Sequence, residues 1–543
     1  MSSCFAARKE VGMRGLLFRA GNRFLPLLVL ALVIVPSRQS FAIPAFSRLY
    51  GTSCSTCHID FPKLNDFGKA FKDAGFKFPK DDESFLKTPP VLLGAPAQAE
   101  LWPHTVYPGS IPGQLPVGLR YNTYYQQVSA NRNNFNLVLP AGTVGSFIPK
   151  SDFQPGYFSI FTAGNFGSDI SFWVDDDISV AGANANGALG DGYLKFNNIS
   201  RLMKLPTDSL NLRAGQFELD LPFSQARSWN LSGWDIFSEA NIGIQNGLGP
   251  QQNVNNGAAM EDAANGVEFS GGHSYQGYHY SFAVFDQNTT GVNISPPNVA
   301  PQNAVAFNSD ANFKDLYGRL VYRFNLEKDP ASRNDVQAAG TTGPRDHTFL
   351  ALGTFYFYGR TAQPFSGVLA DGVTPTVLTA REPFYRIGGD VNFNYRTFNL
   401  FGVYLAAHDH NLLPVTAPGA AAITGFTPSA AATFSGGFVE ADYLALPWAM
   451  TIMRWDQVKS TADRVNFIEY NPAAPPASSF FSPYSATRNR FTPGEQFLIH
   501  ANIKASIEYQ IWPQQIVYNP ATGVALTGPF RTNALIVGLE FVY

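Results

Sequence analysis

Two cysteines and a histidine in this sequence are spaced in a way that predicts a specific chemistry. The segment reads Cys54-Ser55-Thr56-Cys57-His58. Two thiols three residues apart on one helical turn can add to the two vinyl groups of one porphyrin, and the adjacent histidine then reaches the iron from one face. We therefore expect one covalently attached c-type haem, with Cys54 and Cys57 as thioether attachments and His58 as the proximal iron ligand.

Three other interpretations of this cysteine pair explain fewer of its features. A structural zinc ion needs about four ligands, and the sequence has no second pair of cysteines. A thioredoxin-like dithiol would lie in a βαβ context, which the flanking sequence does not suggest. A plain disulfide would not require His58. The third cysteine, Cys4, lies in a segment that we expect to be removed on export.

The sixth ligand of the predicted haem iron is not evident from the sequence. Residues 43–103 contain no methionine and no second histidine, and His104 is the nearest candidate for a distal ligand. A distant histidine, water or an open coordination site remain as alternatives. An open site would permit ligand chemistry on the iron, whereas a filled site would favour outer-sphere electron transfer.

The residues that follow the motif predict a small helical module over residues 43–103. Phe61, Leu64, Phe67, Ala70 and Phe71 recur at helical spacing. A segment this short buries little apolar surface by itself, so we expect its core to include the porphyrin.

The first 42 residues resemble a cleaved export signal. A basic N-terminal part is followed by an apolar run, Leu25 to Val35, and by Ser40-Phe41-Ala42 as a cleavage signal. The run is too short for a comfortable membrane span, and we expect the mature chain to begin near Ile43. Removal of residues 1–42 removes six basic residues and one acidic residue, so the net charge changes from -3 to -8. This charge does not favour a nucleic-acid partner.

The composition of the 543-residue chain is typical of a membrane β-barrel. Charged residues make up 15% of the chain, below the ~25% of soluble proteins, and aromatic residues make up 14%. The mean hydropathy of -0.08 nevertheless excludes a bundle of transmembrane helices. Apolar residues must therefore be interleaved with polar ones, as in a barrel. A water-soluble all-β domain with two packed sheets is the alternative.

Alternation with period two begins near residue 116 and recurs to the end of the chain, which predicts an all-β porin-like barrel over residues 116–543. Segments 316–326, 386–396 and 499–510 alternate in this way. The last strand is expected to end on an aromatic residue, as bacterial outer-membrane proteins often do. Its apolar face comprises Leu535, Val537, Leu539, Phe541 and Tyr543.

We count roughly fifteen candidate strands, and because single-chain bacterial barrels have even numbers we expect about sixteen, around an aqueous lumen. Long extracellular loops are expected at 243–263, 286–311, 361–383, 409–432 and 470–494. Basic residues expected to face the lumen, either as simple pore lining or as partners of the haem propionates, are Arg319, Arg386, Arg396 and Lys504.

The haem segment resembles that of fused monohaem cytochrome c–porin proteins of the outer membrane, a family that includes outer-membrane Fe(II) oxidases. The resemblance runs from Phe46-Ser47-Arg48 through the haem motif and Phe61-Pro62-Lys63-Leu64-Asn65 to Phe67-Gly68-Lys69-Ala70-Phe71 and Gly75-Phe76, and Leu212 to Glu218 resembles a porin strand. It implies a signal, a haem module and a barrel in that order, with haem held by Cys54, Cys57 and His58.

Such a protein would carry electrons between an extracellular donor, with Fe(II) as a candidate, and periplasmic c-type cytochromes, as an iron:cytochrome c oxidoreductase. A module of roughly sixty residues, with a radius of gyration of about 10 Å, is small enough to plug or cap the barrel. Two alternatives remain open: a porin for small solutes in which the haem is a sensor, gate or structural element, and an enzyme with an open haem iron. Expected partners are outer-membrane lipid and further copies of the chain, since large porins are often trimers.

Overall fold

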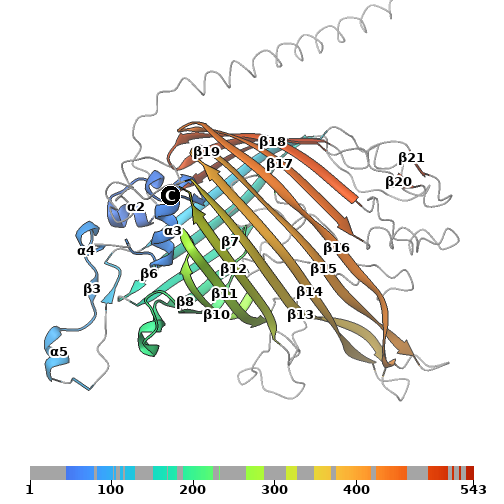
Figure 1. The fold of residues 1–543 in the computed structure, drawn as a ribbon, viewed down its shortest axis with the longest axis horizontal. Coiled ribbons are helices and arrows are strands. Elements are labelled where there is room, and N and C mark those ends of the chain that lie inside the picture. The colour runs from blue at the N-terminus through green and yellow to red at the C-terminus, as the bar shows by residue number, and fades with distance from the viewer. Residues whose placement is uncertain are drawn as a thin grey trace, which may run out of the picture. The chain divides into compact units, whose positions relative to one another are not determined.

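The computed structural model contains a closed antiparallel barrel of sixteen strands, which confirms the predicted fold class (Figure 1). It describes residues 45–78, 82–101, 103–104, 110–113, 116–128, 151–167, 169–179, 188–223, 231–232, 264–286, 314–326, 348–368, 375–416, 423–460, 487–511, 517–518, 525–526 and 533–543. All of them belong to one compact unit, residues 42–543. The predicted export signal lies outside the described residues.

The strands follow one another around the barrel, and the last strand pairs with the first. Tyr543 and Leu119 exchange two backbone hydrogen bonds of 2.7 and 2.8 Å at this seam. The strands are β5 (Val117–Val128), β6 (Ser151–Phe166), β7 (Ile170–Ser179), β8 (Ala188–Phe196), β9 (Asn211–Phe217), β10 (Ala264–His273), β11 (Gln276–Asp286), β12 (Asp315–Asn325), β13 (Phe349–Val368), β14 (Pro375–Tyr395), β15 (Phe398–Thr416), β16 (Ile423–Leu446), β17 (Ala449–Ser460), β18 (Thr487–His500), β19 (Ile503–Gln510) and β22 (Ala534–Val542).

In the alternation predicted from the sequence, apolar residues lie on the outer face of the barrel and polar or aromatic residues lie on the inner face. On β12, Leu320 and Tyr322 are about half exposed, whereas Tyr317 and Arg323 are buried. Burial also alternates along β14 and β22. The third predicted segment, 499–510, is interrupted by a turn at residues 501–502, so its alternation holds only within β19.

Among the described residues, no helix is both long enough and apolar enough to cross a membrane.

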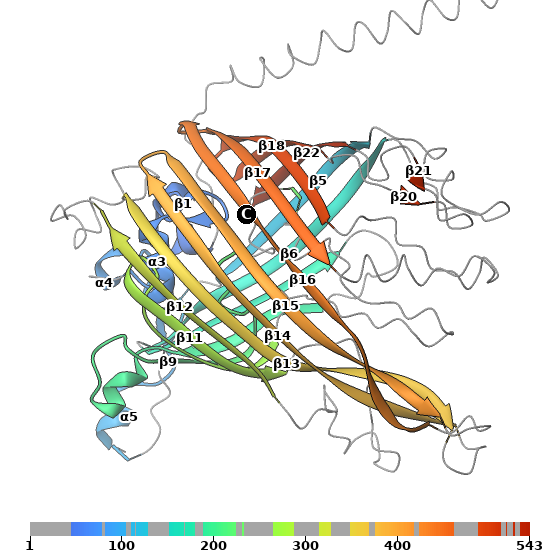
Figure 2. The same cartoon turned by 45° about the vertical axis from the view of Figure 1, so that its right-hand side comes forward.

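The two ends of the barrel differ in how the strands are connected. At one end, two-residue turns join β10 to β11, β14 to β15, β16 to β17 and β18 to β19. At the other end, strands β13 to β16 continue as long paired hairpins (Figure 2). We call the first end the short-turn end.

Several loop predictions for the other end are wrong, because paired strands occupy much of those segments. Most of 361–383 and 409–432 belongs to β13, β14, β15 and β16, and residues 487–494 belong to β18. Continued pairing satisfies backbone groups that a loop would leave to water. Residues 243–263, 287–311 and 470–486 of the predicted loops lie outside the described residues.

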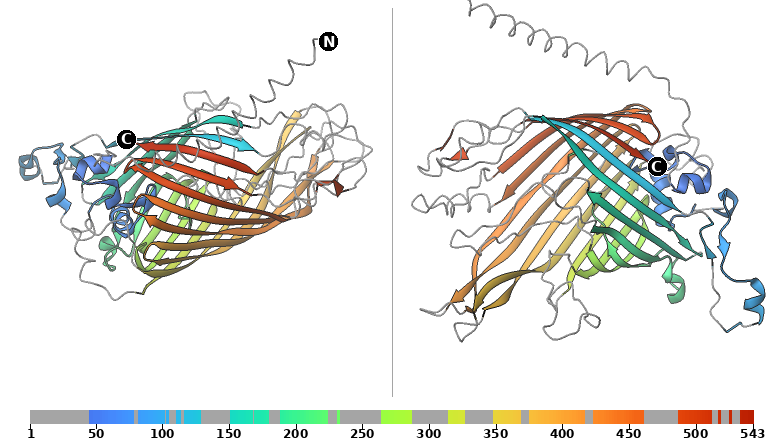
Figure 3. Two further views of the ribbon diagram at one scale, coloured as in Figure 1. Left: turned by 90° about the horizontal axis from the view of Figure 1, so that it is seen from above. Right: turned by 180° about the vertical axis from the view of Figure 1, so that it is seen from behind.

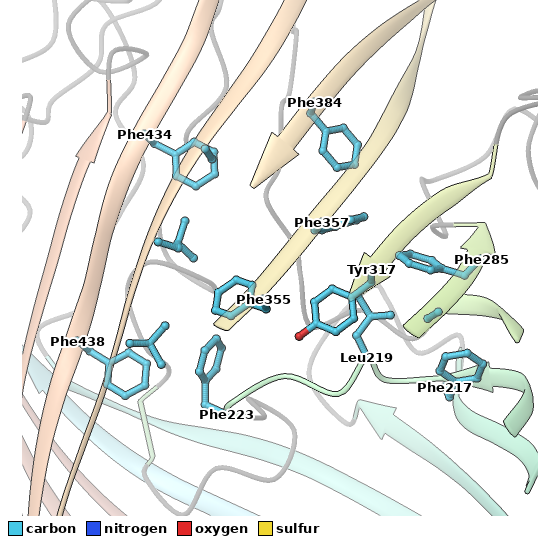
Figure 4. Close-up of a cluster of buried hydrophobic side chains, with 14 of the residues drawn as sticks. Phe217, Leu219, Phe223, Phe285, Tyr317, Phe355, Phe357, Phe384, Phe434 and Phe438 are labelled. Carbon is cyan, nitrogen blue, oxygen red and sulfur yellow. The ribbon is translucent and has the colours of Figure 1, made fainter. Parts of the chain in front are cut away.

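A large apolar cluster, which we call the interior cluster, lies inside the barrel (Figure 4). Phe223 meets Phe438 of β16 edge to face, with ring centroids 5.4 Å apart. The prediction of an aqueous lumen did not include this apolar cluster, and buried charged side chains such as Arg454 and Asp456 lie in the barrel besides it. The cluster comprises Tyr193, Phe217, Leu219, Phe223, Ala283, Phe285, Tyr317, Phe355, Phe357, Phe384, Val403, Leu405, Ala407, Phe434, Phe438 and Val458.

The chain that follows β9 enters the barrel interior. The hydroxyl of Tyr317 donates to the carbonyl oxygen of Asp220 at 2.8 Å. Further along, the Ser232 hydroxyl donates to Glu508 on β19 at 2.6 Å and accepts from Arg454 on β17 at 2.7 Å. The described parts of this segment, residues 218–223 and 231–232, therefore contact strands on several sides of the barrel wall.

The N-terminal module is made of short elements (Figures 1 and 3). The helix predicted from the apolar spacing begins only at Asp66, because residues 58–64 form a small hairpin instead. The elements are α2 (Ala45–Tyr50), η1 (Cys54–Thr56), β1 (His58–Asp60), β2 (Lys63–Leu64), α3 (Asp66–Asp73), α4 (Asp82–Phe85), β3 (Val91–Leu92), α5 (Pro96–Leu101) and β4 (Ser110–Ile111).

Candidate functional site

Cys54 and Cys57 lie on a single tight turn. The 3-10 helix η1 begins at Cys54, and the amide of Cys57 closes the turn by donating to the carbonyl oxygen of Cys54 at 3.1 Å. Both residues are free thiols. Burial raises the pKa of both thiols, to about 12 for Cys57. The turn therefore presents two neutral sulfur atoms that are not joined to each other.

The imidazole of His58 is oriented by a backbone carbonyl. Its Nδ1 lies 3.2 Å from the carbonyl oxygen of Pro62, so that Nδ1–H donates to this oxygen in the neutral tautomer that carries the proton there. A histidine held in this way offers Nε2 to a metal ion. Burial lowers the pKa of His58 to about 4, against the opposing effect of hydrogen bonds to the backbone of Pro62 and Lys63. The ring is neutral near pH 7, which is the form that binds a metal.

Asn65 connects the cysteine turn to α3, and sequence analysis did not single it out. Its Nδ2 donates to the carbonyl oxygen of Thr56 at 3.0 Å, and its Oδ1 caps α3 by accepting from the amide of Gly68 at 2.9 Å. A Cβ on Gly68 would lie 2.2 Å from the carbonyl oxygen of Cys57, so only glycine lets the helix approach the turn this closely. An asparagine just before a helix is the local signal that would have identified it.

An aromatic cluster, which we call the module cluster, packs beside the cysteine turn. Its buried rings belong to Tyr50, Phe67, Phe71, Phe76 and Phe78, and Cys57 packs against them. Tyr50 stacks on Phe78 with centroids 4.2 Å apart. Of the residues predicted for the core of the module, Phe67 and Phe71 belong to this cluster.

Trp173 on β7 joins this cluster to the barrel interior. It packs against both the module cluster and the interior cluster. Its ring centroid lies 5.7 Å from that of Phe76 and 5.9 Å from that of Phe161. Packed side chains are therefore continuous from Cys57 into the barrel.

A largely buried ion pair links α3 to the barrel wall. Arg323 on β12 donates from Nη1 and Nη2 to the two carboxylate oxygens of Asp66, both at 2.7 Å. Lys69 lies 3.2 Å from the same carboxylate, and the guanidinium of Arg323 lies 3.5 Å from the ring centroid of Phe349. Burial alone would raise the pKa of Asp66, but the two cations outweigh it and hold the pKa below its usual range.

Two lysines make further polar contacts between the module and the barrel. Lys63 donates to Asn399 on β15 at 2.8 Å and pairs with Asp442 on β16 at 3.3 Å. Lys504 on β19, which is almost fully buried, donates to the carbonyl oxygen of Phe61 at 2.9 Å and pairs with Glu540 at 3.3 Å.

Contacts of the module are spread around the short-turn end rather than confined to one side. Arg48 donates to the carbonyl oxygen of Val117 on β5, and Asp73 accepts from Ser274 in the β10–β11 turn at 2.8 Å. Asn165 on β6 donates to the carbonyl oxygen of Phe76 at 3.3 Å. Residues 48–76 thus contact strands on opposite sides of the ring.

His104 lies in an exposed turn directly after α5. Helix α5 lies well apart from α3 in Figures 1 and 2. No contact among those described joins His104 to His58, so its role as a distal ligand stays a prediction.

Three of the four basic residues expected in the lumen lie there. Arg319 and Arg386 are bound to Asp390 at 3.0 Å and to Asp409 at 3.2 Å. Lys504 is the one of the four that contacts the module. The prediction for Arg396 is wrong: β14 ends at Tyr395, and Arg396 is exposed in the following turn.

No protein-family model and no curated protein matches this sequence. Among solved structures, the anion-selective porin from Comamonas acidovorans is similar at 10% identity, over 79% of this chain and 98% of that chain, with a TM-score of 0.42. Salmonella typhi OmpF, solved in complex with daunomycin, is similar at 10% identity, over 80% of this chain and 98% of that chain, with a TM-score of 0.43. OmpT, an outer membrane protein of Vibrio cholerae, is similar at 8% identity, over 81% and 99% of the two chains, with a TM-score of 0.39. At these identities the likeness concerns the fold alone.

Proposed function

We propose that this chain is an outer-membrane protein that carries one covalent c-type haem in residues 43–103 and transfers electrons between an extracellular donor and a periplasmic c-type cytochrome. The observation that carries the proposal is the turn that holds two free thiols, Cys54 and Cys57, next to an imidazole whose Nδ1 is already bound by the carbonyl of Pro62. These three side chains are the set that c-type haem attachment requires.

The residues around the turn suit this cofactor. Cys54 and Cys57 would form the two thioether bonds, and His58 would bind the iron through Nε2. The module cluster, which packs against Cys57, supplies apolar surroundings that limit access of water. Once bound, the haem would supply a one-electron iron centre.

The barrel surface supports placement in a lipid bilayer. Large apolar side chains remain exposed on the outer face, among them Leu320, Ile387, Tyr404 and Leu539. Bacterial barrels have short turns on the periplasmic side and longer connections outside. In this orientation the short-turn end, with the haem module as its plug, faces the periplasm, and the long β13–β16 hairpins face the exterior.

The barrel interior favours electron transfer over diffusion of solutes. A diffusion pore needs a continuous water path, and the interior cluster together with the segment after β9 reduces the space left for one. Trp173 extends the packed side chains to the module cluster.

An extracellular Fe(II) ion would lose one electron and the periplasmic cytochrome would gain one, so the overall reaction balances. Fe(II) is our candidate donor because the haem segment resembles that of outer-membrane Fe(II) oxidases.

Covalent haem is tested on the purified full-length protein. We expect a Soret band and haem that stays with the polypeptide after denaturation in SDS. Replacement of both motif cysteines, Cys54→Ser with Cys57→Ser, should abolish covalently bound haem, whereas Cys4→Ser should not change it. A wild-type protein without a Soret band and without the mass of one porphyrin would overturn the proposal.

Electron transfer is tested separately. We expect rapid haem reduction when Fe(II) is mixed anaerobically with the protein. Solute flux through planar bilayers, without any reduction by Fe(II), would instead support the porin alternative.

A further inference from the structure

Two buried carboxylates share the inner face of the barrel wall near the end opposite the module. Glu382 on β14 and Asp409 on β15 are each only 2% exposed. Asp409 pairs across the strands with Phe384, two residues from Glu382, so the two carboxylates are diagonal neighbours on one face. Asp409 lies 11 positions beyond Phe398, where β15 leaves the short-turn end. At ~3.3 Å per residue and a tilt of about 45° this is roughly 25 Å along the barrel axis, the height of an outer-membrane apolar band.

One oxygen of each carboxylate has no partner. Glu382 accepts from the amide of Leu412 at 2.7 Å through Oε1, while Oε2 is buried without a hydrogen bond. Asp409 accepts from Arg386 at 3.2 Å through Oδ2, while Oδ1 is likewise buried and unbonded. A buried carboxylate oxygen without a donor is costly, and a bound cation would satisfy it.

The charges around these two oxygens favour a cation. Arg386 pairs with Asp409 at 3.2 Å, whereas the described hydrogen bond to Glu382 comes from the uncharged amide of Leu412. Arg386 itself is held among aromatic rings, with its guanidinium 4.2 Å from the centroid of Phe384. Two neighbouring carboxylates, Glu382 and Asp409, are thus compensated by the one guanidinium that pairs with Asp409.

We propose that Glu382 and Asp409 bind one hydrated divalent cation of the Fe(II), Mn(II) and Mg(II) class. Such ions take oxygen ligands and keep several waters. Water must supply most of the shell, because the described residues contain no group of three His, Cys, Asp or Glu side chains able to hold a metal ion. The inference rests on the proposed function, because it names the place in the barrel where a metal donor from outside is received.

Mn(II) is a suitable probe, because electron paramagnetic resonance counts its unbound fraction directly. We expect one Mn(II) per full-length barrel, displaced by Fe(II). Glu382→Gln and Asp409→Asn should each weaken binding by at least about tenfold, since affinity follows the number of charged ligands. Asp286→Asn is the matched control at the end of β11: it removes the same charge, but both oxygens of Asp286 already accept from Lys314, at 2.8 and 2.7 Å. Its Mn(II) affinity should equal that of the wild type.

Binding is normalised to the folded fraction, measured by the shift in electrophoretic mobility that barrels show on heating. If one variant fails to fold, the site is still tested by Mn(II) binding to the other variant and by competition of Mg(II) with Mn(II) on the wild type. Absence of Mn(II) binding to the wild type, or Mn(II) binding by both variants as tight as that of the wild type, overturns the site. Loss of Mn(II) binding in the variants supports the site even if Fe(II) fails to reduce the haem, a failure that would count against the proposed function alone. If Fe(II) reduces the haem but the variants bind Mn(II) as tightly as the wild type, the metal site is overturned and the proposed function is not.

Discussion

The ion pair between Asp66 and Arg323 should hold the module on the barrel, and Asp66→Asn tests this. The Arg323 side chain is only 3% exposed and donates two hydrogen bonds of 2.7 Å to Asp66. Removal of one partner of such a buried pair typically costs ~3–5 kcal/mol. The cost is smaller here by about 1 kcal/mol, because in the variant Arg323 still contacts the Phe349 ring and still donates a hydrogen bond of 3.0 Å to Asn325.

The net loss of docking free energy is therefore about 2–4 kcal/mol, or roughly 30- to 700-fold in the docking equilibrium. Hydrogen exchange of the α3 amides measures it, because these amides are protected while the helix is docked. We expect their exchange to accelerate by that factor in Asp66→Asn, while the amides of β12 keep their protection.

The double variant Asp66→Leu with Arg323→Met is the control. It removes both charges together, which is often close to neutral for a buried pair, so its α3 exchange should lie near that of the wild type. Exchange in Asp66→Asn within threefold of the wild type would refute the idea that this pair anchors the module.

Three further predictions follow from the module and its contacts. The partners of Asp66 hold its pKa below the usual range. The stabilisation from the ion pair is therefore complete above about pH 4 and is lost as the pH falls through the folded pKa. Hydrogen exchange of the α3 amides, corrected for its intrinsic rate, should accelerate on acidification in the wild type but not in Asp66→Asn. Gly68→Ala should lower the yield of covalent haem, measured by haem stain per polypeptide, because the new Cβ would collide with the Cys57 carbonyl. Lys504→Met should destabilise the protein in urea by about 1–3 kcal/mol, because Glu540 loses one of its cations.

Two matched variants serve as controls. Gly318→Ala adds a Cβ whose nearest neighbour is 3.9 Å away, so its haem yield should equal that of the wild type. Lys314→Met removes a half-exposed partner of Asp286 and should cost no more than about 1 kcal/mol. An equal effect of Lys314→Met and Lys504→Met would contradict the role given to Lys504.

The barrel could be predicted because its outer face imposes a regular pattern on the sequence. A strand with one lipid-facing side must alternate, as β12, β14 and β22 do. The interior cluster was missed because β13 is apolar on both faces: Phe355 and Phe357 point inward, while Leu352 and Tyr356 are exposed. Hydrophobicity alone cannot assign the faces of such a strand.

The haem motif could be read from five adjacent residues, but the contacts that position it could not. Asp66 and Arg323 are 257 positions apart, and nothing near either residue identifies its partner. Arg396 was placed in the lumen by continuing the alternation one position past the end of β14. Long-range ion pairs and strand ends depend on the closed ring, which local pattern does not encode.

Closure of the ring by β22 and β5 has a consequence for the order of assembly. Arg48 of α2 donates to Val117 on β5 and lies over the ring of Tyr543, with 5.8 Å to its centroid. Tyr543 is in turn bound to Leu119 of β5. Helix α2 is therefore held by β5 and by Tyr543, the residue that follows β22. The N-terminal module is translated before every strand. Its binding surface on the barrel is nevertheless complete only after the last strand has paired with the first.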